Sequence, residues 1–122
     1  MARFGLLLLN KGKWDQTQII PPSYFDLMIT TSQNINLSYG YLTWLNGKTS
    51  SMVPGLQTVF NQSISPSAPA DLFAAMGKNG QLIDVVPSQG LVIIRMGDVP
   101  DASLVPFTFQ EELWKEMNKV IR

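Results

Sequence analysis

The sequence predicts an α+β fold in which an antiparallel sheet of about four strands carries a C-terminal helix, with short helices before the sheet. Two observations predict this class. Strand-like segments bounded by turn residues fill the middle and second half of the chain, and an amphipathic segment with helical spacing ends it. Strands joined by short turns pair antiparallel, so we expect the last helix to lie across the sheet.

Two short helices are expected near the N-terminus. Residues 2–10 carry Phe4, Leu7 and Leu8 at helical spacing, and no N-cap residue precedes them. We therefore expect the natural start of this helix to lie upstream of Met1. A second helix is predicted to open at residues 21–23 and to run to about residue 31, with Ser23 as its N-cap.

Four segments are predicted to be strands. Residues 37–45 alternate aromatic with small or polar side chains, and Asn46-Gly47 after them is typical of a hairpin turn. The other three strands are predicted at residues 73–80, 81–86 and 91–96. Between the first and second strands, residues 48–71 are rich in Ser, Pro, Gln and Asn, which predicts a loop and a candidate binding surface.

The terminal helix is predicted to open with a capping box formed by Thr108 and Glu111. Its apolar face is expected to carry Leu113, Met117, Val120 and Ile121. One well-patterned helix covers only part of the apolar surface that four strands present, so the sheet is expected to be incomplete in this chain.

Composition excludes several classes of function. The chain has 122 residues, about the size of one domain, and its nine basic and nine acidic side chains cancel. Without a basic cluster, nucleic acid is not an expected partner. The sequence contains neither His nor Cys, so a thiol nucleophile, an imidazole base and the usual ligands of zinc are absent, and no metal or cofactor is predicted. No signal peptide or membrane-spanning run is visible.

Two other groups of residues are predicted to have no catalytic role. Asp84, Asp98 and Asp101 could suggest a metal site or an acid–base pair, but a strand flank and a proline-bounded loop predict carboxylates that face solvent. Gly47-Lys48-Thr49 ends like a phosphate-binding loop, yet position 42 is Leu where that loop needs Gly.

The stretch Lys78-Asn79-Gly80-Gln81 carries the most specific chemical signal. Period-two alternation places Met76, Lys78 and Gly80 on one face of a strand. Acyl transfer by a serine without histidine needs a cation beside the nucleophile, a small residue that admits substrate, and a backbone N–H as oxyanion donor. Lys78, Gly80 and the amide of Gln81, at the edge of a strand, match these three roles.

Three blocks of sequence, in this order, resemble the C-terminal part of the serine β-lactamase and penicillin-binding-protein-like superfamily, and most closely its esterase and amide-hydrolase branch. These blocks are MARFGLLLLNKGKWDQTQII, YGYLTWLNG and FAAMGKNGQLIDVVPSQGLVIIRMG. The resemblance covers nearly the whole chain and is weakest from 48 to 71. It implies a partial β-lactamase or transpeptidase-like fold, with residues 1–36 ending a helical region and residues 37–122 forming the C-terminal share of an α/β domain.

By this resemblance, Lys78 lines the active site and Gln81 donates its backbone amide to the oxyanion hole. Asn79, a substrate-binding position, stands where the family often has Thr or Ser. The family nucleophile lies in Ser-x-x-Lys, which this chain lacks, and Ser32-Gln33-Asn34 matches the second family motif only in the wrong place. The expectation is thus a C-terminal fragment of a serine hydrolase that is inactive alone.

The complete enzyme is expected to hydrolyse a small ester, amide or lactam through an acyl-enzyme, with the missing N-terminal half supplied in cis or in trans. Family members are often periplasmic or membrane-anchored in bacteria, and this sequence leaves the compartment open. The alternative is a non-catalytic binding or assembly domain that self-associates through an exposed sheet edge.

Overall fold

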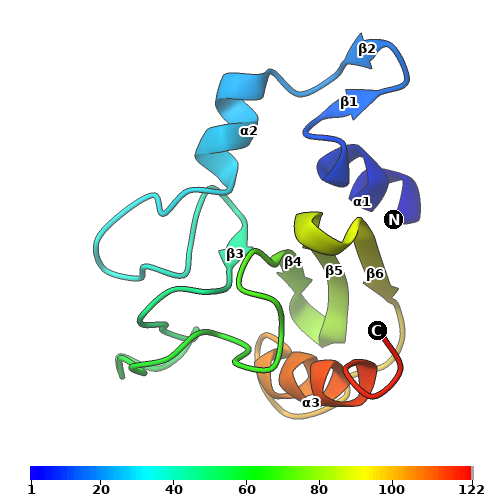
Figure 1. Ribbon diagram of the computed structural model, residues 1–122. Coiled ribbons are helices and arrows are strands. Elements are labelled where there is room, and N and C mark those ends of the chain that lie inside the picture. The colour runs from blue at the N-terminus through cyan, green and yellow to red at the C-terminus, as the bar shows by residue number, and fades with distance from the viewer. Residues whose placement is uncertain (122) are drawn as a thin grey trace.

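A four-stranded antiparallel sheet with a helix on each face organises the computed structural model, which describes residues 1–121. The strands lie in the order β3-β4-β5-β6, so β5 is internal and β6 is an edge strand. Figure 1 shows α1 on one side of this sheet and α3 on the other. The elements are α1 (Ala2–Leu9), β1 (Lys13–Trp14), β2 (Thr17–Gln18), α2 (Pro22–Met28), β3 (Trp44–Leu45), β4 (Phe73–Gly77), η1 (Lys78–Gly80), β5 (Gln81–Val86), η2 (Pro87–Gln89), β6 (Leu91–Arg95) and α3 (Phe107–Met117). The predicted α+β class, with its four-stranded antiparallel sheet and C-terminal helix, is therefore confirmed.

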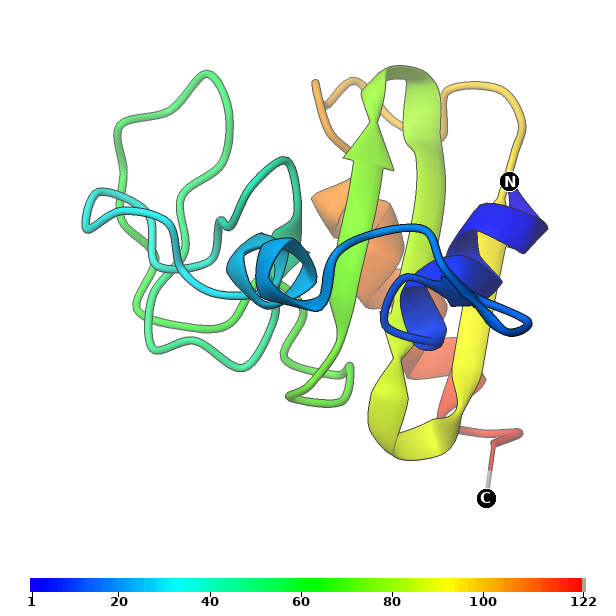
Figure 2. The same ribbon diagram turned by 90° about the horizontal axis from the view of Figure 1, so that it is seen from above.

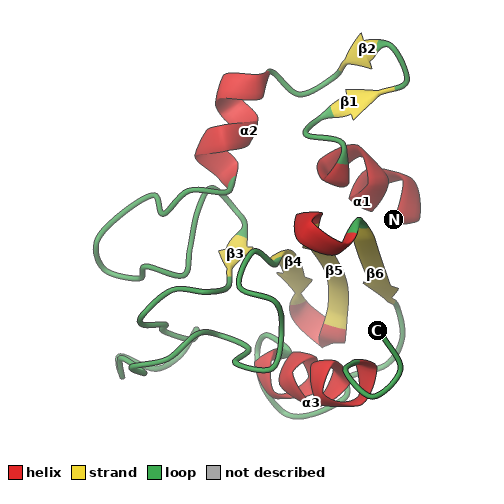
Figure 3. Cartoon of the chain, in the orientation of Figure 1, coloured by secondary structure: helices red, strands yellow, loops and turns green. Residues whose placement is uncertain are grey.

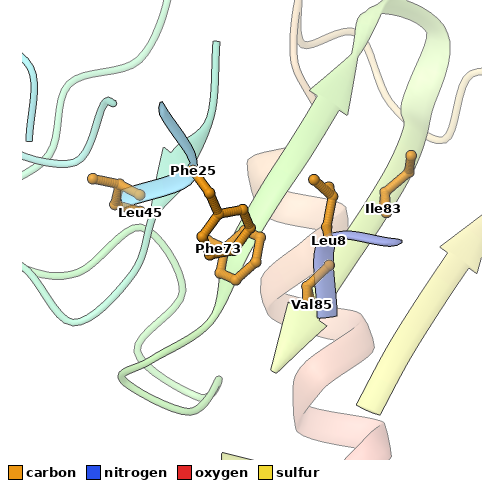
Figure 4. Packing of buried hydrophobic residues seen from close by; sticks show 6 residues of the cluster. All are labelled: Leu8, Phe25, Leu45, Phe73, Ile83 and Val85. Atoms are coloured by element: carbon orange, nitrogen blue, oxygen red, sulfur yellow. The ribbon is translucent and has the colours of Figure 1, made fainter. Parts of the chain in front are cut away.

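The first hydrophobic cluster lies between the sheet and the two N-terminal helices. Ile83 and Val85 point to this side from β5, and Leu8 of α1 packs on them (Figure 4). Phe25 of α2 meets Phe73 of β4 edge to face, with ring centroids 6.0 Å apart. Both N-terminal helices are therefore attached to the sheet through apolar contact, which removes part of the uncovered surface expected from the sequence.

Helix α1 approaches the sheet closely because Gly5 faces it. A Cβ atom at Gly5 would overlap Cγ1 of Val92 on β6, well inside van der Waals contact. The buried positions of α1 are Gly5 and Leu8. Phe4, one of the three apolar residues at helical spacing, is 46% exposed. The glycine sets which side of the helix can reach the strands.

The second cluster lies between the opposite face of the sheet and α3. Figure 2 shows α3 running behind the strands when α1 lies in front of them. Trp114 is fully buried there and packs with Val86 and with residues of β6. Trp44 of β3 contacts the ring of Phe107 edge to face, at 4.8 Å between centroids. These contacts connect the start of α3 to β3 and its middle to β5 and β6.

The predicted inner face of α3 was only partly right, since Met117 and Ile121 do pack against the second cluster. Its buried residues are Gln110 and Trp114, and Val120, predicted to be apolar core, is 73% exposed. The predicted capping box is also absent, because the helix begins at Phe107, so Thr108 lies inside its first turn, and no side chain caps it. Hydrogen bonds with a buried carboxylate, described below, rotate the helix so that Gln110 faces inward.

The strand predicted at residues 37–45 is reduced to two residues. Gly40 donates its backbone N–H to the carbonyl of Thr43 at 2.8 Å, and Leu42 has a φ of 55°, so the chain reverses direction before β3. The expected Asn46-Gly47 hairpin was also wrong, since β3 pairs with β4 across an intervening loop. Ser23 was wrongly predicted as an N-cap, because α2 begins at Pro22.

Residues 46–72 contain no helix or strand longer than a single bridge, which confirms the predicted loop. Figure 3 shows this long green segment extending beside the sheet. Within residues 1–121, no helix is both long and apolar enough to cross a membrane.

Candidate functional site

The Lys-x-Gly stretch forms the tight connection between β4 and β5. Gly77 pairs with Gln81, and the three residues between them make the short helical turn η1. Asn79 has a φ of 65° and Gly80 a φ of 76°. Two successive left-handed residues cannot continue a strand, so β4 ends at Gly77 and the predicted strand to residue 80 was wrong at Lys78, Asn79 and Gly80. Lys78 projects from the end of the sheet and not from its face.

The turn conformation gives a physical reason for asparagine at position 79. Asparagine enters the left-handed region more readily than other residues with a side chain, whereas the β-branched threonine is disfavoured there. The departure from the Thr or Ser that the resemblance implies is therefore consistent with the backbone of this turn. The side chain of Asn79 is exposed at the tip.

Gly80 is buried because neighbouring groups close over it. A Cβ atom at this position would overlap Cδ of Pro100 and would lie 2.6 Å from Nη1 of Arg95. The same Arg95 nitrogen donates a hydrogen bond to the carbonyl oxygen of Gly80 at 2.9 Å. Glycine is required here both by its positive φ and by this close approach.

Arg95, at the end of β6, connects the turn to its surroundings. Besides its bond to Gly80, its Nη2 donates to the carbonyl of Asp98 at 2.6 Å. Its guanidinium carbon lies 5.0 Å from the centroid of the Phe109 ring on α3, within cation–π range. Sequence reasoning missed Arg95, because its three partners lie in three different segments and no local spacing indicates them.

Gln81 stabilises the turn with its side chain. The Nε2 group donates to the carbonyls of Asn79 at 3.0 Å and Gly97 at 2.8 Å. Gln81 is the first residue of β5, which is an internal strand of the sheet. It lies beyond Leu82, the last residue of β5 that pairs with β6. The role of its backbone amide stays a prediction.

Lys78 is the reactive group that this turn presents. Its side chain is exposed, and it forms no hydrogen bond or ion pair with any residue in the described part of the chain. No serine or threonine hydroxyl within residues 1–121 forms a hydrogen bond with a lysine ammonium group, so no lysine is placed to activate a hydroxyl nucleophile. The turn thus supplies a cation and a rigid backbone but no nucleophile–base pair.

A buried carboxylate lies away from this turn, at the centre of the sheet. Asp84 of β5 is fully buried and accepts hydrogen bonds from Nε2 of Gln110 at 2.8 Å and Nε1 of Trp114 at 2.9 Å. The expectation that Asp84 faces solvent was wrong. Burial raises the pKa of Asp84 to about 6, even though the bonds from Trp114 and Gln110 act to lower it.

The other two candidate aspartates lie in the loop after β6. Asp98 is exposed as predicted, and Asp101 is partly exposed. Hydrogen bonds from the hydroxyl and the backbone N–H of Ser103 lower the pKa of Asp101. Across residues 1–121, no group of three or more acidic side chains is placed to hold a metal ion.

Comparison with known proteins identifies no relative: no family model, no curated protein and no solved structure matches this chain.

Proposed function

We propose that this chain contributes the cation and the hairpin turn of a β-lactamase-like serine hydrolase whose nucleophile lies outside these residues. One observation carries the proposal. The ammonium of Lys78 has no partner within residues 1–121, yet the turn that bears it is stabilised by Arg95 and Gln81. A cation on a preorganised backbone can stabilise the negative charge that develops in acyl transfer.

The sequence gives the reason for placing the nucleophile outside these residues. No Ser or Thr has a lysine three residues later, and the chain has no His or Cys. In the proposed reaction, a serine from the other portion attacks an ester, amide or lactam carbonyl, the alcohol or amine leaves, and water then releases the acyl group. Lys78 would lie near the developing oxyanion or a substrate carboxylate.

The experiment uses a protein expressed from its natural gene with a C-terminal affinity tag, so that every species containing these residues is captured. A fluorophosphonate probe is expected to acylate such a species on a serine outside these 122 residues. Lys78→Ala is expected to slow acylation about 100-fold, because it removes a charge that acts in the transition state. The rate is measured by intact mass spectrometry.

Lys48→Ala is the matched control, since Lys48 lies in the loop after β3 and its ammonium also forms no hydrogen bond or ion pair in the described residues. It should leave the acylation rate unchanged. Acylation of a serine within residues 1–122, or equal rates for both variants, would overturn the proposal.

A second candidate function, assembly through the sheet edge, is favoured by β6. This five-residue strand contains no proline, and in the described residues it pairs on one side only, with β5. Unpaired N–H and C=O groups on an apolar edge strand can add another strand. We infer that two copies can associate through β6.

Self-association predicts a reversible dimer whose fraction rises with concentration in light scattering. In hydrogen exchange, the β6 amides that point away from β5 should become protected at high concentration, while exposed amides of α2 should not change. A chain that remains monomeric at millimolar concentration, with constant β6 exchange, would rule out the assembly function.

A further inference from the structure

A hollow lies between the loop that follows β3 and the first half of α3. Its volume is about 540 Å³, within the range of sites for small molecules. Five apolar side chains line it: Val53, Phe60, Ile64 and Pro66 from the loop and Phe107 from the helix. Figure 1 shows the loop and α3 side by side at the lower part of the molecule. Lys78 does not line this hollow, so its chemistry is independent of the proposed hydrolase site.

Hydrogen bonds hold the loop wall in place. Ser51 and Phe60 exchange two backbone hydrogen bonds, each of 2.9 Å, which closes the loop between them. The hydroxyl of Ser51 also donates to the carbonyl of Gln62 at 3.0 Å. These bonds fix the backbone at Phe60 and Gln62, two residues of the loop that line the cavity.

Glu111 attaches the far end of the loop to α3. Its carboxylate accepts hydrogen bonds from the hydroxyl of Ser65 at 2.8 Å, and from the backbone and hydroxyl of Ser67 at 3.1 and 2.7 Å. Partial burial acts to raise the pKa of Glu111, but the bonds from Ser67 and Ser65 and the charge of Lys115 outweigh it and lower the pKa. The hydrogen-bonding capacity of the Glu111 carboxylate is thus used within the protein, and we do not expect this group to bind the ligand.

Two donors on the same side of α3 remain at the cavity. The hydroxyl of Thr108 has no hydrogen-bond partner in the described residues. The ammonium of Lys115 donates one hydrogen bond to Glu112 at 2.8 Å and forms a longer ion pair of 3.8 Å with Glu111, which uses one of its three N–H groups. Thr108 and Lys115 can therefore both donate to an oxygen atom inside the cavity.

The charges around the cavity indicate which kind of oxygen-bearing ligand it can bind. The charged side chains that line the cavity are Glu111 and Lys115, and their charges cancel, so the lining has no net charge to attract an ion. Both oxygens of Glu111 already accept hydrogen bonds from Ser65 and Ser67, so they offer little to a cation. Apolar walls with free donors and no free counter-charge fit an uncharged molecule with one acceptor.

We propose that this cavity binds an uncharged small molecule that combines an aromatic ring or short acyl chain with a carbonyl oxygen. The apolar part packs on Phe60, Ile64 and Phe107, and the carbonyl accepts from Thr108 or Lys115. The 540 Å³ volume is large enough for a bicyclic ring.

The test uses the full chain and 6-propionyl-2-dimethylaminonaphthalene, an uncharged fluorophore with a naphthalene ring and one carbonyl. Saturable binding with blue-shifted emission is expected, with a dissociation constant on the order of 0.1 mM, as typical for a ligand of this size. In heteronuclear NMR, the amides of Val53, Phe60 and Thr108 should shift together during titration.

Phe60→Ala should weaken binding at least about 5-fold, because it removes one wall. Phe4→Ala is the matched control: it truncates a similarly exposed ring on α1, on the opposite face of the sheet, and should leave binding unchanged. Thr108→Val keeps the shape and removes the hydroxyl, so it provides a second variant in which the loop is untouched. An anionic naphthalene sulfonate should not shift the three cavity amides.

Amide shifts that map to α1 and the β1–β2 hairpin, or equal affinity for all three variants, would overturn the proposal. Binding of the sulfonate at the cavity with higher affinity than the ketone would overturn the assignment of an uncharged ligand.

Discussion

Asp84→Asn is expected to raise the free energy of unfolding by up to about 3 kcal/mol at neutral pH and to have little effect below about pH 4. The native state buries Asp84 completely, and burial raises its pKa from 3.8 to about 6. The gap between these values corresponds to about 3 kcal/mol in favour of the protonated form. Asparagine has nearly the same shape and carries no charge at any pH, so it avoids this cost.

The direction of this pH dependence follows from the linkage between proton binding and folding. A carboxyl group with a raised native pKa stabilises the fold fully below its unfolded pKa and loses that contribution as pH rises through the native pKa. For Asp84, the loss occurs between pH 3.8 and about 6. The difference in stability between Asp84→Asn and the natural chain should therefore grow across this interval and remain constant at higher pH.

Hydrogen-bond geometry allows the substitution. In Asp84→Asn, the new amide oxygen would accept from Nε1 of Trp114, and the new amide nitrogen would donate to Gln110 after that side chain turns by about 180°. The Oε1 atom of Gln110 is buried and has no hydrogen-bond partner in the described residues, so it can take up this role. Asp84→Ala should behave in the opposite way and destabilise the fold by about 2–3 kcal/mol, because both donors lose their acceptor.

Urea unfolding followed by circular dichroism, at several values between about pH 3 and 8, measures these differences. Glu111→Gln is the control whose effect on stability should change with pH in the opposite direction. Because the pKa of Glu111 is lowered in the native state, its carboxylate stabilises the natural chain above pH 4.5, and this contribution is lost when the carboxylate is protonated. A stability difference for Asp84→Asn that stays flat with pH would show that Asp84 is not a buried titrating group.

The strand order of the second half could be predicted from the sequence because its signals are local. Residues 81–86 and 91–95 are apolar runs separated by one turn, and each strand pairs with the next along the chain. The loop was also predictable, since its Ser, Pro and Asn content is a property of the segment itself. Local composition was sufficient wherever neighbours in sequence are also neighbours in space.

The position of Asp84 could not be predicted, because its partners lie 26 and 30 residues later. One aspartate within an apolar strand looks the same whether it faces water or a partner helix. The same long-range contact explains why Gln110 and Trp114, the buried residues of α3, were not part of its predicted apolar face. The only signal was that Gln110 and Trp114 occur four residues apart and both carry N–H donors.

The candidate site, too, was only partly predictable from the sequence. Lys78 and Gly80 were found from a three-residue pattern, but whether the pattern lay on a strand or in a turn depended on two φ angles. Arg95 and the loop at residues 97–101, which determine the shape of the turn, gave no sequence signal. A pattern of residue types therefore identified the groups, and long-range packing determined their orientation.

Asn46→Asp is expected to destabilise the fold by on the order of 3 kcal/mol or more at neutral pH, although the two side chains have nearly the same shape. The Nδ2 group of Asn46 donates to the carbonyls of Ser65, Ala68 and Pro69 at 2.9, 3.2 and 3.0 Å. Its Oδ1 accepts from the backbone N–H of Ser65 at 3.1 Å. A carboxylate would place a charged oxygen against three carbonyl oxygens in a site that is only 6% exposed.

The consequence should extend from the loop to α3. Ser65 is held by Asn46 on one side and donates its hydroxyl to Glu111 on the other, so loss of the first contact weakens the second. Hydrogen exchange at Ser65 and Ser67 should accelerate more than exchange in β5. Binding of the naphthalene ketone should weaken as well, because the same loop forms one wall of the cavity.

Protonation should partly reverse the defect, because a neutral carboxyl group can donate one hydrogen bond to the carbonyls. Asn46→Asp is thus expected to be closer to the natural chain at about pH 4 than at about pH 7 in urea unfolding. Asn61→Asp is the matched control: it makes the same chemical change in the same loop, at an exposed side chain without hydrogen bonds to other residues in the described chain. Equal stability of the two variants at neutral pH would contradict the assignment of Asn46 as the residue that organises the loop.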